Sequence, residues 1–278
     1  MGSVQLNVGT VKKIKSRNPI IEFDKLQLYF KKPYIINAPD ENHQIIIQQP
    51  RIGDIVEFGQ GRYYSTINIF TTNTTASRLQ LWEKGIDWND ISDFELFIRI
   101  FNAAEKSIYQ KILFNKIEKP LDFSTYGMYE KKSKDGKTEK VLYSKDDEVE
   151  INENVYFHLS QYFRNVFNIF PDEKITHDST MKKWFIRKDK NELTNKQLKG
   201  NDAEKDNGFM SLISACCNHP GFKYKPSELE EIGVYEFYDS VKRLQVYESC
   251  TALQKGMYSG MIDGSKINSE DYNFMKNI

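Results

Sequence analysis

The residues best suited to chemistry form one short cluster, Cys216-Cys217-Asn218-His219, in the sequence SACCNHP. Thiolate and imidazole groups bind zinc, and a cysteine beside a general base can act as a nucleophile. A structural zinc site needs four such ligands, however, and neighbouring residues of a helix point about 100° apart. Cys216 and Cys217 are therefore poorly placed to hold one ion together. Because free cysteine is among the most buried residue types, we interpret the cluster as part of a core helix that ends at Pro220.

The other candidate motifs are incomplete. The remaining cysteine and histidine residues show no paired spacing: His43, His158, His177 and Cys250. Several carboxylates between positions 146 and 150 resemble a metal-binding group, but they lie at the predicted base of a hairpin, where solvated charges are common. The sequence contains neither Gly-x-Gly-x-x-Gly nor a Gly-Lys-Ser/Thr phosphate loop. We predict no catalytic residue, no metal site and no cofactor, and hence a protein that is not an enzyme.

The composition narrows the class of protein further. The chain has 278 residues, of which 39 are basic and 39 acidic. This balance argues against a protein whose main role is to wrap nucleic acid or an anionic membrane. Three cysteines do not suggest a disulfide framework, and no apolar run approaches the roughly 18 residues of a membrane span. We expect an intracellular protein that is not bound to a membrane.

The N-terminal part of the sequence has a mixed pattern. Residues 1–19 are polar and basic and are predicted to form a flexible arm. Residues 20–120 are predicted to begin with short strands, in IIEFDKLQLYF, PYIINA and HQIIIQQP, and to continue with helices. The stretch PRIGDIVEFG suits either a strand or a short helix. In the helix near residues 91–101, capped by Ser92 or Asp90, one apolar face is predicted to lie in the core: Ile91, Phe94, Phe97, Ile100 and Phe101.

Residues 121–152 are predicted to form a β-hairpin, because Asp135-Gly136 separates two strand-like runs. Residues 153–278 are predicted to be helical, with a basic helix near 180–199. The last long helix is predicted to start just after Pro226 with a capping box of Ser227 and Glu230. The predicted fold class is therefore α+β and mostly α-helical, with a β-containing N-terminal part, an inserted hairpin and a helical C-terminal half.

Three long stretches carry a resemblance to a known family: residues 49–97 from QPRIGDIVEFGQG, residues 150–171 from EINENVYFHLSQYF, and the C-terminal block from LISACCNHPGFKYKPSELEE to the end. Together they make most of residues 45–278 resemble phage and prophage proteins of low-GC Gram-positive hosts, of the tail-assembly-chaperone type. The resemblance implies a non-catalytic role in the host cytoplasm. Its implied partners are the tape-measure protein and tail-tube subunits, and a homo-oligomer is expected.

The predicted partner-binding residues are apolar side chains near the C-terminus, because methionine and aromatic side chains adapt to helical partners. They are Met257, Tyr258, Met261, Tyr272, Phe274 and Met275. The same residues could instead pack against the chain's own helices. One alternative function is a structural component of the virion, in the tail, baseplate or neck. A second is nucleic-acid binding through the basic helix, which the neutral net charge disfavours.

Overall fold

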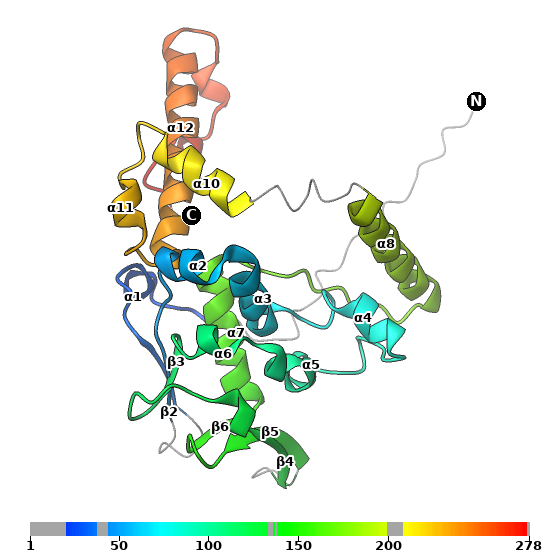
Figure 1. Cartoon of the computed structure of the whole chain (residues 1–278). Coiled ribbons are helices and arrows are strands. Elements are labelled where there is room, and N and C mark those ends of the chain that lie inside the picture. The colour runs from blue at the N-terminus through cyan, green and yellow to red at the C-terminus, as the bar shows by residue number, and fades with distance from the viewer. Residues whose placement is uncertain (1–20, 38–43, 133–135, 137, 199–207, 277–278) are drawn as a thin grey trace, which may run out of the picture.

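The computed structural model describes residues 21–37, 44–132, 136, 138–198 and 208–276. In these residues the protein is α+β and mostly helical, as the sequence predicts. Figure 1 shows a body with two small sheets at one end and the long helix α12 rising from the other. The predicted arm of residues 1–19 lies outside the described residues, and the four predicted regional boundaries stay predictions.

The elements up to the second sheet follow in this order: α1 (Lys25–Tyr29), β1 (Tyr34–Asn37), β2 (Gln44–Ile47), α2 (Ile52–Phe58), α3 (Gln60–Thr71), α4 (Arg78–Glu83), α5 (Asp93–Ile100), η1 (Phe101–Ala103), α6 (Lys106–Tyr109), β3 (Leu113–Asn115) and η2 (Phe123–Thr125). The remaining elements are β4 (Gly127–Lys132), β5 (Thr138–Ser144), β6 (Val149–Ile151), α7 (Glu153–Phe167), α8 (Ser179–Leu198), α10 (Gly208–Cys217), α11 (Pro226–Leu229), α12 (Val234–Tyr258), η3 (Gly264–Lys266) and η4 (Ser269–Tyr272).

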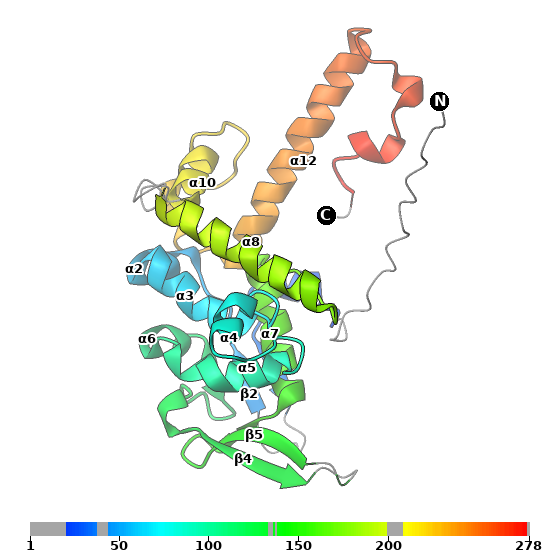
Figure 2. The same ribbon diagram turned by 90° about the vertical axis from the view of Figure 1, so that its right-hand side faces the viewer.

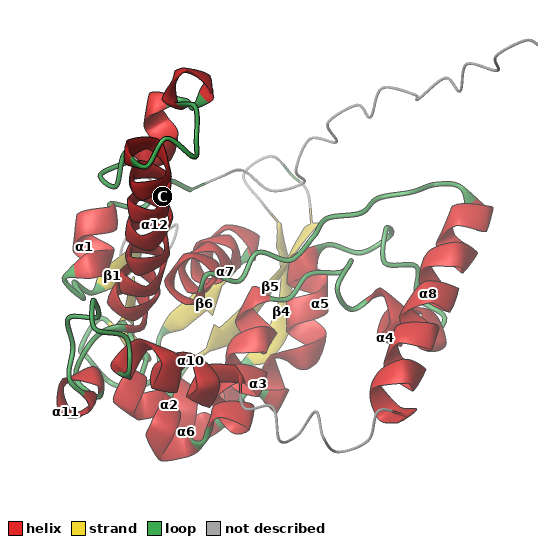
Figure 3. Ribbon diagram, turned by 90° about the horizontal axis from the view of Figure 1, so that it is seen from above, coloured by secondary structure: helices red, strands yellow, loops and turns green. Residues whose placement is uncertain are grey.

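Helix α7 is the centre of the core. It contacts β1 of the antiparallel sheet β1-β2-β3, β6 of the antiparallel sheet β4-β5-β6, and helices α3, α5 and α12. Figure 3 shows α7 beside the strands, with helices around them. Asn152 caps α7, because its side-chain oxygen accepts the N–H of Val155. The apolar side chains of α7 are almost completely buried. The core helix Asp93–Ile100 is capped by Ser92, the first of the two predicted caps, in a box with Glu95.

Two short segments near the N-terminus for which the sequence allowed strands form helices instead. PRIGDIVEFG forms the helix α2, so the helical interpretation is confirmed. The stretch IIEFDKLQLYF was predicted as a strand, and this is wrong for its second half, which forms α1. Asp24 explains the difference, because its Oδ1 accepts the N–H groups of Leu26 (2.9 Å) and Gln27 (3.4 Å) and so starts a helical turn.

The inserted hairpin is confirmed. β4 and β5 pair antiparallel from Gly127↔Tyr143 to Lys132↔Thr138, and β6 adds a third strand beside β5. Gly136 has φ +76°, the left-handed region that the predicted turn requires of its glycine, and Asp135 lies outside the described residues. The hairpin lies at the end of the molecule opposite α12 (Figure 1).

The start of the last long helix differs from the prediction. Pro226–Leu229 forms the separate helix α11, and α12 begins only at Val234. The predicted capping box of Ser227 and Glu230 is therefore absent. At the start of α11 the backbone N–H of Lys225 donates to Glu228 Oε2 instead. The chain turns at residues 230–232, and Gly233 then forms an antiparallel bridge with Arg51, with hydrogen bonds from Ile52 N–H to Ile232 C=O and from Val234 N–H to Pro50 C=O.

Gly233 permits this close approach of the two segments. A Cβ at that position would lie 2.2 Å from Gln49 Oε1 and 2.7 Å from Lys31 Cγ. Tertiary pairing therefore overrides the helical pattern of the sequence at this point.

A buried polar junction joins three helices. The Arg164 side chain of α7 donates to the carbonyls of Thr71 (2.9 Å) and Thr72 (3.0 Å) at the C-terminal end of α3. Asp93 at the start of α5 accepts the N–H of Thr74 at 2.8 Å, and its other oxygen lies 4.0 Å from Arg164. A cation at a helix C-terminus is electrostatically favourable, so Arg164 both caps α3 and fixes the loop that follows.

His158 gives the fold a testable pH dependence. Its Nδ1 lies 2.7 Å from the Tyr34 hydroxyl, and burial lowers its pKa below the usual 6.5. The unfolded chain therefore binds this proton more readily, so the free energy of unfolding should fall as pH drops below about 6.5. We expect urea titrations of His158→Gln to show a shallower decline with pH than the parent. His177→Gln, at an exposed histidine, should keep the parental slope; equal slopes in all three proteins would contradict the assignment.

Candidate interaction surface

The C-terminal segment forms an arm, defined here as residues 243–276. The first half of α12 belongs to the core through Val234, Phe237 and Val241, and the second half leaves it. Figure 2 shows the chain turning back after α12 and running beside it. The six predicted partner-binding residues all lie on this arm.

The returning chain is held to α12 along the length of the arm. Arg243 donates to the carbonyls of Lys276 (2.7 Å) and Phe274 (3.3 Å). The Phe274 ring packs edge-on against Tyr247, with ring centroids 6.2 Å apart. Cys250 is buried and its Sγ lies 3.5 Å from the Asp271 carbonyl oxygen. The arm is therefore a two-layered unit in which each layer depends on the other.

Glycines make the turn at the end of the arm compact. A Cβ on Gly256 would lie 2.5 Å from Ile262 Cδ1, and one on Gly264 would lie 3.0 Å from Met257 Sδ. Ile262 and Met257 therefore each pack on the bare backbone of the opposite segment. Either glycine would require a rearrangement if it carried a side chain.

The end of α12 is a Schellman motif. Gly260 has φ +72°, its N–H donates to the Met257 carbonyl, and the N–H of Met261 donates to the Gly256 carbonyl. In most such motifs the residue after the glycine packs back on the last helical turn. Here that turn offers only Gly256, where Ile262 packs, and Met261 stays 87% exposed. The tip, defined as residues 256–264, thus fixes its backbone while it leaves a large apolar side chain in solvent.

The six predicted residues divide into two groups. Tyr258 (88% exposed) and Met261 are the most exposed large apolar side chains of the described residues, and Met275 and Phe274 are also exposed. Met257 and Tyr272 are partly buried within the arm. Their role in partner binding stays a prediction, and the structure separates the side chains that hold the arm together from those that it exposes.

Truncation of the chain before Asn268 should destabilise the arm. The deletion removes η4 and exposes Cys250 and one side of Tyr247. The apolar area that becomes exposed equals that of about one or two side chains. We expect a loss of about 1–3 kcal/mol in the free energy of unfolding and a melting temperature lower by about 2–6 °C. Calorimetry of the truncated and parent proteins measures this. An unchanged melting temperature would contradict the packing role of the returning chain.

The cysteine cluster lies at the end of α10. Cys216 is buried in the core, where desolvation raises the pKa of its thiol, and Cys217 packs partly buried beside it. His219 accepts the N–H of Gly221 through Nδ1 at 3.0 Å and lies 3.6 Å from Glu248. The core interpretation is confirmed for Cys216, because its side chain is buried. His219 stabilises the turn after α10 through its hydrogen bond from Gly221. In the described residues no three His, Cys, Asp or Glu side chains gather as a metal site.

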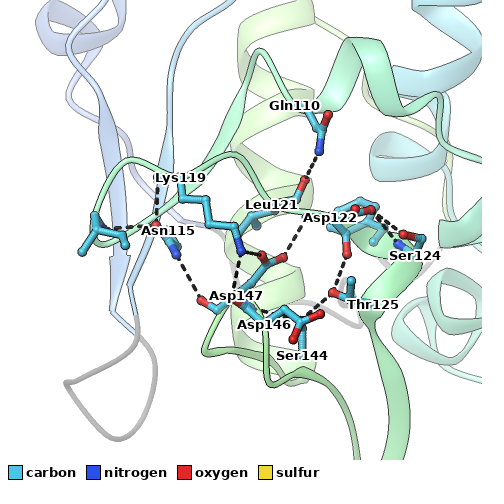
Figure 4. Close-up of polar contacts among 12 residues, drawn as sticks. Gln110, Asn115, Lys119, Leu121, Asp122, Ser124, Thr125, Ser144, Asp146 and Asp147 are labelled. Carbon is cyan, nitrogen blue, oxygen red and sulfur yellow. Dashed lines mark hydrogen bonds and ion pairs between the residues drawn. The ribbon is translucent and has the colours of Figure 1, made fainter.

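The carboxylates between 146 and 150 are not all solvated, which corrects the interpretation from sequence. Figure 4 shows Asp147 inside a polar network between the β5–β6 turn and the loop before η2. Asp147 is buried, its Oδ2 accepts the N–H of Asp122 at 2.7 Å, and Lys119 Nζ lies 3.1 Å from its Oδ1. The neighbouring Asp122 has its pKa lowered to about 2, chiefly by a hydrogen bond from Lys106. This network joins two loops of the body.

The basic helix α8 uses several of its charges within the molecule. Arg78 of α4 forms a bidentate pair with Asp189 of α8 (2.6 and 2.5 Å), and Lys182 pairs with Asp87. Ile186 of α8 packs into a small apolar cluster with Trp88. These contacts dock α8 against the body.

Residues 201–278 match a family model described as the YomV second domain. YomV is a Bacillus prophage protein. The match covers α10, α11, α12 and the whole arm, and it links this part of the chain to prophage proteins, in agreement with the coarser part of the predicted resemblance. No curated protein and no solved structure matches the chain. No helix of the described residues is long and apolar enough to span a bilayer.

Proposed function

We propose that this chain is a non-catalytic prophage protein of virion morphogenesis, which binds a partner protein through the tip of its arm. The observation that supports this most directly is the rigid display of Tyr258 and Met261. A backbone fixed by a Schellman motif and two glycine contacts carries the two most exposed apolar side chains of the described residues. Such preorganised apolar anchors are typical of binding hot spots.

The specific role we propose is that of a tail assembly chaperone. Its partners would be the tape-measure protein, which the resemblance implies, and tail-tube subunits. A long amphipathic helix presents apolar anchors at intervals of three and four residues, and methionine adapts to such varied surfaces. Several copies of the chain, each with one tip, could coat such a helix along its length.

The test combines capture with particle analysis. The tagged chain is purified from cells in which the prophage has been induced, and virions from the same culture are analysed by mass spectrometry. A chaperone should capture the tape-measure protein and be absent from virions. A fixed copy number in virions would instead make the chain a structural tail component. Capture of nucleic acid, released steeply by salt, would overturn the protein-binding role.

A further inference from the structure

Strand β1 has a neighbouring strand on one side only. It is the first strand in the order β1-β2-β3 and pairs with β2. Figure 3 places β1 on the side of the body away from β4 and β5. In the described residues, the backbone of β1 forms no hydrogen bond beyond its pairing with β2. Every second N–H and C=O group of β1 therefore points away from β2 and lacks a partner in this part of the chain.

The outer face of this sheet carries a row of apolar side chains. Ile36 of β1 points into the core, where it is buried, so the neighbouring Ile35 points to the opposite face, and it is 51% exposed. The register places Ile35 beside Ile46 of β2, and Ile46 beside Phe114 of β3. Ile46 and Phe114 are both partly exposed. The row thus ends at the open edge of β1 with its most exposed member.

The described part of the chain begins close to this edge. It starts at Ile21, and the Phe23 ring packs edge-on against Tyr34, the first residue of β1, with ring centroids 5.1 Å apart. Residues 1–20 are therefore attached near the Tyr34 end of β1. An extended chain spans about 3.3–3.6 Å per residue, so the thirteen positions from Val8 to Ile21 reach about 43–47 Å. The four residues of β1 span only about 13 Å.

Residues 4–8 have the pattern of a strand. In their sequence, VQLNV, apolar and polar side chains alternate and none is charged. The rest of the segment suits a strand less well, because residues 12–17 contain four basic side chains and Pro19 lacks an N–H group. A strand added at β1 would satisfy the open backbone groups, and its apolar side chains would extend the row that ends at Ile35.

We propose that residues 4–8 dock in the same molecule as a fourth strand of this sheet, antiparallel to β1, with Leu6 beside Ile35 on the outer face. The antiparallel direction puts residue 8 at the Tyr34 end of β1, where the described chain begins. The two polar residues of VQLNV then share a face with Tyr34, whose hydroxyl lies 2.7 Å from His158 Nδ1. This contact does not involve the arm, so it is independent of the proposed function.

Hydrogen exchange of the full chain, resolved at single amides by NMR, tests the proposal. In Gln5→Pro with Leu6→Pro, two consecutive residues lose their N–H groups, so a donor to β1 disappears whichever of the two faces it. We expect the β1 amides that point away from β2 to exchange about tenfold or more faster in this variant than in the parent. The matched control, Lys13→Pro with Ile14→Pro, changes the same segment outside residues 4–8 and should keep the parental rates. Amides of α7 should exchange equally in all three proteins, which distinguishes a local loss from general unfolding.

A disulfide tests the register and identifies the molecule that supplies the strand. Residues directly opposite each other in an antiparallel pair have Cα atoms about 4.5–5.5 Å apart, a separation that a disulfide spans. We expect oxidation of Leu6→Cys with Ile35→Cys to join the two cysteines within one chain, in a mixture of unlabelled and ¹⁵N-labelled chains. Ile14→Cys with Ile35→Cys is the matched control and should give a yield lower by about fivefold or more.

Three results would overturn the proposal. The first is equal exchange of the outward β1 amides in the parent and in the double proline variant. The second is a disulfide yield no higher from position 6 than from position 14. The third is a disulfide found only between labelled and unlabelled chains, which would make a second copy the source of the strand.

Discussion

Replacement of Arg164 by methionine should lower the free energy of unfolding by about 3–5 kcal/mol, the largest loss we expect from a single substitution in this chain. The guanidinium is buried, and it satisfies the carbonyls of Thr71 and Thr72 while it faces Asp93. Methionine keeps much of the side-chain volume, but it removes the donor to both carbonyls and the cation 4.0 Å from Asp93. Urea denaturation followed by circular dichroism measures the loss.

Two further variants separate charge from geometry at this position. Arg164→Lys retains the charge, but a single ammonium replaces a planar fork with two donors in fixed positions, so we expect an intermediate loss of about 1–3 kcal/mol. Arg99→Met removes an exposed arginine of α5 and should change the stability by no more than about 0.5 kcal/mol. If Arg164→Met proved no more destabilising than Arg99→Met, the junction of α3, α5 and α7 would not depend on this side chain.

The sequence could not predict this junction. Thr71 to Thr75 form a run of polar residues, the composition of a surface loop, yet all five are buried. Their polar groups are satisfied by residues about 90–100 positions away, such as Arg164 and the carbonyl of Asp172, which Asn73 contacts at 3.1 Å. No local pattern carries that information. Asp147 was misjudged for the same reason, because its partner Asp122 lies in a separate loop.

Features with local causes were predicted well. The hairpin follows from a turn dipeptide between two strand-like runs, and α5 follows from a capping residue and one apolar face. At Gly233 the error arises because a distant segment competes with the local pattern: pairing with residues 50–53 interrupts a sequence that reads as one continuous helix. The error at α1 is local, because the cap formed by Asp24 was not recognised. For the arm, the residue types indicated apolar side chains, but only the Schellman turn and the packing of Ile262 decide that Met261 faces solvent.

Replacing both Tyr258 and Met261 by serine should weaken binding of the tape-measure protein by about thirtyfold or more, with little change in stability. Hot-spot anchors contribute about 2 kcal/mol or more each, and a loss of 2 kcal/mol corresponds to about thirtyfold in Kd. Neither side chain is buried in the free chain, so the melting temperature should stay within about 2 °C of the parent. Co-expression capture followed by calorimetric titration gives both quantities.

The matched control for the tip is Ile117→Ser, which removes another highly exposed apolar side chain, 78% in solvent, from the loop after β3. A general loss of surface hydrophobicity would weaken binding in both proteins, whereas a specific site on the arm would spare Ile117→Ser. Gly256→Val adds a second line of argument, because its side chain would displace Ile262 and disturb the tip without removing either anchor. If binding survives the double serine variant and Gly256→Val alike, the partner does not engage the tip.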